Sequence, residues 1–259
     1  MGRQLRPVMR ECSEALGDAA SEASTELASE PSDIEDTLVG SSALSAPFSS
    51  AETLFIFDWD DTLLPTTWLQ RQGFLGSAHD SVPNREQLQQ LELVAAHARA
   101  TVAAAMRFGR VVIVTNAAEG WVEWSCSKFM PSFLSTIEEL DVVAASAYEG
   151  YAGSSPTAWK RLAFEDVVNA VYGDAAAATQ RRNIISLGDA LYEQKALESV
   201  TRGQPHSCGK SVKLMVEPCI HEFIAEHEML GAWLQDAARH CGDLDLEIAT
   251  EPAPTDGHC

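Results

Sequence analysis

Three carboxylates follow directly after an apolar run of the chain. The run is Leu54-Phe55-Ile56-Phe57, and the acids are Asp58, Asp60 and Asp61. A continuous apolar run of this length predicts a strand that is buried on both faces, as in a parallel sheet. The acids do not belong to a core, because an unpaired buried charge is too costly. Since open α/β sheets bind ligands beyond the carboxyl ends of their strands, the acids predict a site; the alternative is a solvated acidic turn.

Further polar side chains follow other predicted strands. Thr115 and Asn116 end a strand predicted at 110–115, and Asp189 follows one predicted at 183–188. Lys160 stands at the start of the helix that precedes the latter strand. Carboxylates with one hydroxyl and one ammonium group suit a hard cation such as Mg²⁺ and a phosphate. A carboxylate can also attack phosphorus to give an aspartyl-phosphate.

The hydrophobic periodicity predicts the elements that position these residues. Strands are expected at 53–57, 110–115, 141–146, 183–188 and 211–216, with a short edge strand at 244–248. Helices are expected at about 85–108, 119–130, 159–172, 191–200 and 218–239, whereas 63–80 is expected to be an irregular connection. The alternation predicts an α/β fold, a Rossmann-like three-layer sandwich with a mainly parallel sheet of about five strands and no full cap domain.

The helix at 85–108 has the clearest local signals. Asn84 is a predicted N-cap, with Gln87 three residues later, and Gly109 ends the segment. Steps of three and four residues predict one core-facing side of the helix. The residues on that side are Leu88, Leu91, Ala95, Ala98, Val102 and Ala105.

The charge of the chain is concentrated at its ends. The formal net charge is −20, to which residues 1–52 contribute −7 and residues 217–259 contribute −9. We expect an acidic, disordered tail at 1–50, a catalytic domain at 51–248 and a disordered tail at 249–259. A polyanionic surface excludes nucleic acid and anionic membranes as partners. The oligomeric state is left open.

The six cysteines form no CxxC motif, and no secretory signal opens the chain. Free thiols and a cytoplasmic location are therefore expected. The neighbouring Cys and His residues near the C-terminus match no common zinc spacing, so a zinc site is not expected.

The motifs together resemble those of the haloacid dehalogenase (HAD) superfamily. Asp58-Trp59-Asp60-Asp61-Thr62 is similar to its first motif, Thr115 to its second and Lys160 to its third. Gly188-Asp189 with Glu193 resembles the acidic fourth motif, although Glu193 replaces the more usual Asp. The likeness covers about 53–216. The longer strings FDWDDTLLPT and VTNAAEGWVE resemble a cap-poor subgroup of these hydrolases, and they imply no particular substrate.

The resemblance implies a role for each matching residue. Asp58 would be the nucleophile, and Asp60 would protonate the leaving group and then deprotonate water. Mg²⁺ would bind Asp58, the Asp60 carbonyl oxygen and Asp189. Thr115 would hold a phosphate oxygen, and Lys160 would neutralise charge in the transition state.

Several assignments stay open. Asn116 either faces the phosphate or caps the next helix, and Lys160 could also be an exposed residue at a helix start. Glu193 either orients Lys160, orients a metal-bound water or is simply solvated. Asp61 is expected to be a turn residue that contacts the loop after the first strand. Trp121 and Trp124 are expected to be packing residues rather than substrate contacts.

Within this superfamily, an acid two residues after the nucleophile favours phosphoryl transfer over dehalogenation. The lack of room for a full cap domain favours hydrolysis over a phosphomutase reaction, which needs a cap to exclude water. The resemblance therefore implies a Mg²⁺-dependent phosphatase that acts on a phosphoprotein, another bulky phosphoester or a small phosphate ester. The alternative is a catalytically silent HAD-like interaction module that works through its acidic tails.

Overall fold

One sheet of seven strands organises the computed structural model, which describes residues 5–9, 46–76, 81–173 and 180–250. The strand order is β1-β7-β6-β5-β2-β3-β4, and every neighbouring pair is parallel except β1 and β7. The strands are β1 (Leu5–Met9), β2 (Thr53–Phe57), β3 (Arg110–Thr115), β4 (Asp141–Ala144), β5 (Arg182–Gly188), β6 (Ser207–Lys213) and β7 (Leu244–Thr250).

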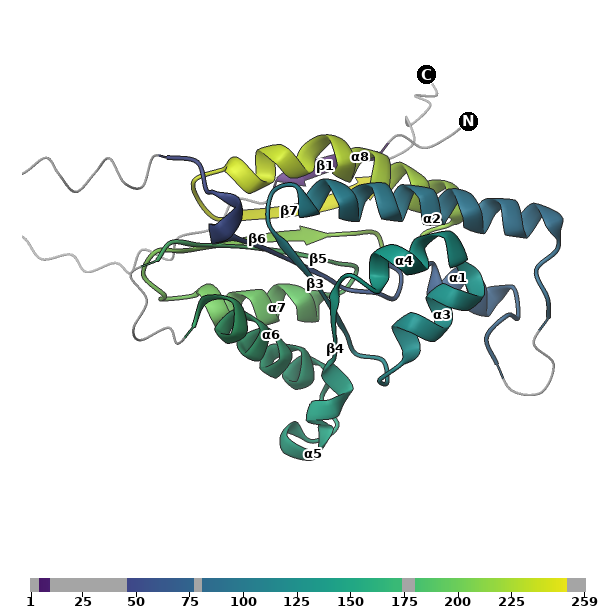
Figure 1. The fold of residues 1–259 in the computed structure, drawn as a ribbon, viewed down its shortest axis with the longest axis horizontal. Helices are drawn as coiled ribbons and strands as arrows, with labels where there is room; N and C mark the ends of the chain where they lie inside the picture. Colours follow the sequence, from purple (N-terminus) through teal and green to yellow (C-terminus); the bar gives the residue numbers. More distant parts are fainter. Residues whose placement is uncertain (1–4, 10–45, 77–80, 174–179, 251–259) are drawn as a thin grey trace, which may run out of the picture.

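Helices cover both faces of this sheet (Figure 1). On one face lie α2 (Arg85–Met106) and α8 (Ile220–Arg239), and on the other lie α6 (Pro156–Tyr172) and α7 (Leu191–Thr201). The shorter elements are η1 (Ser50–Glu52), α1 (Thr66–Arg71), α3 (Trp121–Phe129), η2 (Pro131–Phe133), α4 (Leu134–Ile137), η3 (Ala145–Tyr148) and α5 (Glu149–Ala152). The fold is the predicted Rossmann-like three-layer sandwich.

Strand β2 is the centre of the core because both of its faces are buried. Phe55 and Phe57 belong to the apolar cluster under α2 and α8, whereas Leu54 and Ile56 belong to the cluster under α6 and α7. All four side chains are at most 1% exposed. The apolar run thus serves two layers at once, which explains why it lacks the alternation of a half-exposed strand.

Helix α2 begins as the sequence predicts. Asn84 accepts a hydrogen bond from the Gln87 amide, and the Gln87 side chain accepts one from the Asn84 amide. Among the residues predicted to face the core, the prediction is wrong only for Leu88, which is 52% exposed. Leu88 lies in the first turn of α2, and this end of the helix extends beyond α8 (Figure 1). The segment at 63–80, predicted to be irregular, contains the short helix α1.

The fifth strand lies further toward the N-terminus than predicted. Strand β6 is Ser207–Lys213, whereas 211–216 was expected. The first residues of β6 are mainly polar, so they lack the apolar pattern by which a buried strand is predicted. One of them, Lys210, is nevertheless fully buried. Its ammonium group donates to the carbonyl oxygens of Ala237 and His240 at the end of α8, at 2.6 and 2.7 Å. A buried lysine in a strand is uncommon unless such acceptors are present.

Parts of the two segments that were predicted to be disordered tails belong to the sheet. Leu5–Met9 form β1, and β7 continues to Thr250, so that β7 is an inner strand rather than an edge strand. Residues 46–50 also depart from a tail, since the Arg181 guanidinium lies 4.1 Å from the centre of the Phe48 ring. The remaining tail residues, 1–4, 10–45 and 251–259, lie outside the described part of the chain.

No helix in the described residues is both long and apolar enough to cross a membrane.

A buried histidine ties the two helices of one face to the loop after β2. His227 of α8 is 3% exposed; its Nε2 lies 3.0 Å from the Thr62 carbonyl oxygen and its Nδ1 lies 2.9 Å from Thr101 Oγ1 of α2. Burial lowers the pKa of His227 to about 4, against its ordinary value of 6.5. The neutral ring is therefore part of the native packing.

We expect this histidine to make folding sensitive to acid. In the unfolded chain His227 gains a proton as the pH falls through about 6.5, whereas in the folded chain it does so only near pH 4. The neutral form therefore stabilises the fold above pH 6.5, and roughly 3 kcal/mol is lost as the pH falls to about 4. His227→Gln lacks this titration, so its free energy of unfolding in urea should approach that of the wild type across this range.

The buried Glu226 is present in both proteins, so its titration cancels in the difference. His221→Gln, at an exposed position of α8, is the matched control and should run parallel to the wild type. A constant difference between His227→Gln and the wild type from pH 7 to pH 4 would contradict the assignment.

Candidate functional site

The predicted site residues gather at the carboxyl ends of β2, β3 and β5. There the chain forms a pocket of about 130 Å³, and its lining residues are Asp58, Asp60, Asp61, Asn116, Asp189 and Tyr192. Thr115, Lys160 and Glu193 lie directly behind this lining through contacts with Asp58 and Asp60. Every residue proposed from the sequence is therefore part of one cluster.

Lys160 of α6 holds the centre of the cluster. Its Nζ donates to Asp58 Oδ1 at 2.5 Å and to the carbonyl oxygen of Val114 at 2.6 Å, and it lies 3.0 Å from Glu193 Oε1. Lys160 is fully buried, and Glu193 is only 3% exposed. This geometry excludes the alternatives of an exposed lysine and a solvated glutamate, and it places Glu193 against Lys160.

Lys160, Asp58 and Glu193 form a buried triad, and the charges of its members oppose the pKa shifts that burial alone would cause. Burial alone would lower the pKa of Lys160, but the carboxylates of Asp58 and Glu193 outweigh it and raise that pKa. Burial raises the pKa of Asp58, and it raises the pKa of Glu193 to about 8, while the Lys160 ammonium opposes both shifts. Lys160 therefore stays protonated, and two buried carboxyl groups share one cation.

Gly188 makes room for the glutamate of this triad. A Cβ atom built on Gly188 would lie 2.4 Å from Glu193 Cγ, which is far inside van der Waals contact. The Gly-Asp pair at the end of β5 thus has two functions: the glycine admits Glu193, and the aspartate enters the pocket.

Three donors surround the carboxylate of Asp60. Thr66 Oγ1 of α1 lies 2.6 Å and Trp121 Nε1 of α3 lies 2.9 Å from Asp60 Oδ1, and Thr115 Oγ1 lies 3.3 Å from Asp60 Oδ2. Trp121 packs against the apolar core, as predicted, and its indole nitrogen adds a contact with Asp60 that was not predicted. Thr66 was missed altogether; both contacts depend on how α1 and α3 fold back over the strand ends, which their local periodicity does not reveal.

Trp124 lies beside Trp121 but makes no contact of this kind with the residues that the structure describes. The two rings have centroids 5.3 Å apart, and Trp124 is 48% exposed. Its ring packs against those of Trp121 and Phe129 at the surface, which agrees with the predicted packing role.

Asp61 shapes the turn after β2, as predicted. Its φ is 52°, in the left-handed region. Its side chain accepts hydrogen bonds from the Thr67 amide at 2.8 Å and from the Thr67 hydroxyl at 2.5 Å. An aspartate tolerates this backbone conformation because its short polar side chain can hydrogen-bond locally.

Asn116 and Tyr192 add polar groups to the pocket wall. The N-cap of α3 is Gly120, so Asn116 does not cap that helix. The amide atoms of Asn116 have no hydrogen-bond partner among the described residues. An amide in this position can donate to an anionic ligand. Tyr192 was not predicted from the sequence, although it directly precedes Glu193.

The crowding of acids suits a cation. Burial, together with the negative charges of Asp58 and Asp61, raises the pKa of Asp189 to about 7. No group of three or more His, Cys, Asp or Glu side chains in the described residues is arranged to hold a metal ion. A Mg²⁺ ion would therefore need oxygen ligands besides side chains; backbone carbonyl, water and phosphate oxygens are its usual ones.

No known family model matches the chain, and neither the curated proteins nor the solved structures contain a match.

We expect the Lys160 ammonium to be essential for stability as well as for the site. Lys160→Met leaves Asp58 and Glu193 buried without their cation, which should cost about 3–5 kcal/mol in the free energy of unfolding at pH 7. The loss should shrink at pH 5, because burial raises the pKa of Asp58 and without the ammonium group this carboxyl group can then take up a proton. Urea unfolding followed by circular dichroism measures both values.

Lys195→Met is the matched control, since Lys195 is an exposed lysine of α7. It should change stability by less than about 0.5 kcal/mol. If the two variants were equally stable, the proposed electrostatic role of Lys160 would be wrong.

Proposed function

We propose that this protein is a Mg²⁺-dependent phosphatase that hydrolyses phosphoric monoesters through an aspartyl-phosphate intermediate. One observation carries the proposal: a buried lysine binds the Asp58 carboxylate at the same pocket where Asp60 is held by three donors. A nucleophilic carboxylate, a second acid nearby and a fixed cation are the groups that this chemistry requires.

In the first step, a carboxylate oxygen of Asp58 attacks phosphorus. Since Lys160 holds Oδ1, the other oxygen is the free nucleophile. The bond between phosphorus and the ester oxygen breaks, and Asp60, entering the step as the carboxylic acid, gives its proton to the leaving oxygen. Lys160 lowers the cost of the charge that accumulates on the phosphoryl group.

In the second step, Asp60 acts as the base. It takes a proton from a water molecule whose oxygen attacks phosphorus, and the bond from phosphorus to Asp58 breaks. This releases inorganic phosphate and restores the Asp58 carboxylate. The contacts from Thr66 and Trp121 fix the position of Asp60 for both transfers, and Thr115 and Asn116 would donate to phosphate oxygens.

Asp58, the Asp60 carbonyl oxygen and Asp189 would hold the metal ion. When bound, Mg²⁺ supplies positive charge that offsets the repulsion between an anionic nucleophile and an anionic phosphate. The fit rests on the donor set, which is made of oxygen atoms, and on the excess of carboxyl groups over cations around the pocket.

The substrate proposed is a phosphoprotein or another bulky phosphoester. The pocket is small, and no separate cap domain covers it in the described part of the chain. A pocket of this size would accommodate the phosphate while the rest of the substrate stays outside. The free cysteines among the described residues support a reducing compartment such as the cytoplasm.

The metal requirement is directly testable. We expect the hydrolysis of an aryl phosphate such as 4-nitrophenyl phosphate to depend on added Mg²⁺ and to disappear with a chelator. Activity should return when Mg²⁺ is added in excess of the chelator. Hydrolysis that persists unchanged in the chelator would overturn the metal assignment.

The two aspartates should fail in different ways. Asp58→Asn removes the attacking carboxylate, so turnover should vanish. Asp60→Asn should lower turnover of alkyl phosphates by about 100- to 10,000-fold, because general acid–base catalysis is lost. With an activated aryl phosphate, Asp60→Asn should give a burst of product and then accumulate phosphate on Asp58, which mass spectrometry would locate.

Asp236→Asn, an exposed aspartate of α8, is the control and should keep wild-type turnover. Phosphate located on another residue, or wild-type turnover by Asp58→Asn, would exclude the mechanism. A silent interaction module predicts that every variant and the wild type are equally inactive.

A further inference from the structure

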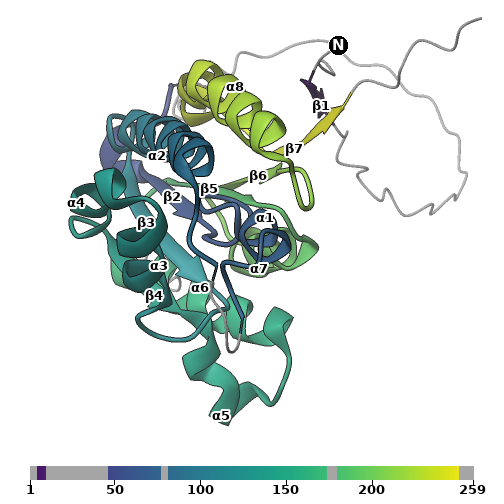
Figure 2. The same cartoon turned by 90° about the vertical axis from the view of Figure 1, so that its right-hand side faces the viewer.

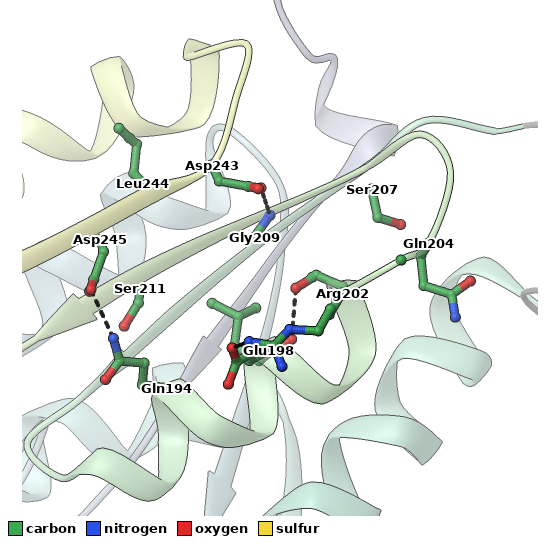
Figure 3. A pocket seen from close by; sticks show the side chains of 13 residues that line it. Gln194, Glu198, Arg202, Gln204, Ser207, Gly209, Ser211, Asp243, Leu244 and Asp245 are labelled. Carbon is green, nitrogen blue, oxygen red and sulfur yellow. Dashed lines mark hydrogen bonds and ion pairs between the residues drawn. The ribbon is translucent and has the colours of Figure 1, made fainter. Parts of the chain in front are cut away.

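A second and larger pocket lies away from the site, between α7 and the strands β6 and β7 (Figure 3). Its volume is about 500 Å³. Polar side chains from α7, from β6 and from the chain that enters β7 line it, and none of them takes part in the mechanism above. The proposed phosphatase chemistry therefore leaves this pocket unexplained.

The alternation along β7 directs carboxylates into this pocket. Leu246 and Ile248 are buried, and Ile248 belongs to the apolar cluster of the α8 face. Asp243 and Asp245, at alternate positions, line the pocket on the opposite face. Asp243 accepts a hydrogen bond from the Gly209 amide at 2.7 Å, and Asp245 accepts one from Gln194 Nε2 at 2.9 Å. These bonds hold both carboxylates in place, but neither donor carries a positive charge.

The pocket has an excess of negative charge. Glu198 of α7 is paired with Arg202, one helical turn later. Neither Asp243 nor Asp245 forms an ion pair with any residue that the structure describes. The buried Lys210 ammonium interacts electrostatically with Asp243, but it lies outside the lining of the pocket. The lining itself, with three carboxylates and one guanidinium, still has an excess of negative charge, which favours a cationic ligand and disfavours an anionic one.

A largely buried serine whose hydroxyl group opens into the pocket supports the same conclusion. Ser211 of β6 is only 7% exposed, and it lies across from Asp245 in the register of the two strands. Its side chain lines the pocket near Gln194 and Asp245, and it forms no hydrogen bond with the described residues (Figure 3). Because its hydroxyl oxygen is open to the pocket rather than enclosed by protein, Ser211 can accept a hydrogen bond from a ligand that donates.

The spacing of the acids decides between an inorganic and an organic cation. Residues at alternate positions of a strand are about 7 Å apart, and the two carboxylates are held by separate donors, the Gly209 amide and Gln194 Nε2, rather than converging on one point (Figure 3). The described residues also contain no group of acids arranged for a metal. Two positive charges on one flexible chain match this spacing better than a single ion does.

We propose that this pocket binds a linear alkyl polyamine, with one ammonium group at Asp243, another at Asp245 and a hydrogen bond to Ser211. The polyamine would occupy the groove between α7 and β6, and its methylene groups would lie against Leu197. Binding at this pocket does not depend on phosphatase activity.

Isothermal titration of the full chain with spermidine, at about 0.15 M salt to screen exposed charges, tests the proposal. We expect saturable one-site binding in the wild type. Asp243→Asn/Asp245→Asn keeps the hydrogen-bond acceptors but removes both charges, and it should weaken binding by about tenfold or more. Ser211→Ala, which leaves the charge unchanged, should weaken it severalfold.

Glu86→Gln/Glu92→Gln is the matched control, because it removes two charges from exposed positions of α2. It should bind spermidine within about twofold of the wild type. Equal weakening in both double variants would show nonspecific attraction to an acidic protein and overturn the proposal. So would the absence of saturable binding, wild-type affinity in Ser211→Ala, or displacement of spermidine by equimolar Mg²⁺.

Discussion

The burial of one ammonium group governs this structure. Lys160 brings together β2 through Asp58, β3 through the Val114 carbonyl oxygen and α7 through Glu193. A buried charge of this kind is tolerated only when its partners are present and well placed, because the desolvation of each ion costs several kcal/mol. The position of α6 relative to the strand ends is therefore fixed by charge as well as by packing. The same contacts that allow Lys160 to be buried also hold Asp58 in the pocket.

Helix α7 takes part in two separate regions of the molecule. Glu193 points into the triad, whereas the next residue, Gln194, binds Asp245 in the larger pocket. Neighbouring residues of a helix diverge by about 100°, so one helix can present acids and amides to both sides. The view of Figure 2 shows the same layer, with α6 and α7 on one side of the sheet and α8 on the other. The polar face of β6 and β7 is thus a neighbour of the proposed catalytic site without being part of it.

Apolar pattern predicts the centre of the fold well and its periphery poorly. Strands β2, β3 and β5 are found where their apolar runs predict them, since burial on both faces leaves few alternatives. The pattern fails at β6, where Lys210 is buried by carbonyl acceptors that come from α8, and at β1, which pairs with a strand from the other end of the chain. Such contacts are long-range, so no local window contains them.

The site residues were likewise predicted where the topology of the sheet places them and missed where tertiary packing places them. Asp58, Thr115, Lys160 and Asp189 are found at strand or helix ends, where topology alone brings them together. The partners of Asp60 were not predicted as such, because Thr66 and Trp121 belong to short helices whose placement depends on tertiary packing. Trp121 also has the side chain of a packing residue, and only its indole nitrogen, aimed at a carboxylate, reveals another role.

The close contact between Gly188 and Glu193 limits which substitutions the chain tolerates at these two positions. Any side chain at 188 would overlap the methylene carbon of Glu193, and a shorter acid at 193 would leave that space empty while reaching less far toward Lys160. Substitutions at these two positions are therefore not independent: each residue is acceptable only because of the other. Among homologous chains, positions 188 and 193 should covary, with the longer acid found only where glycine precedes the aspartate.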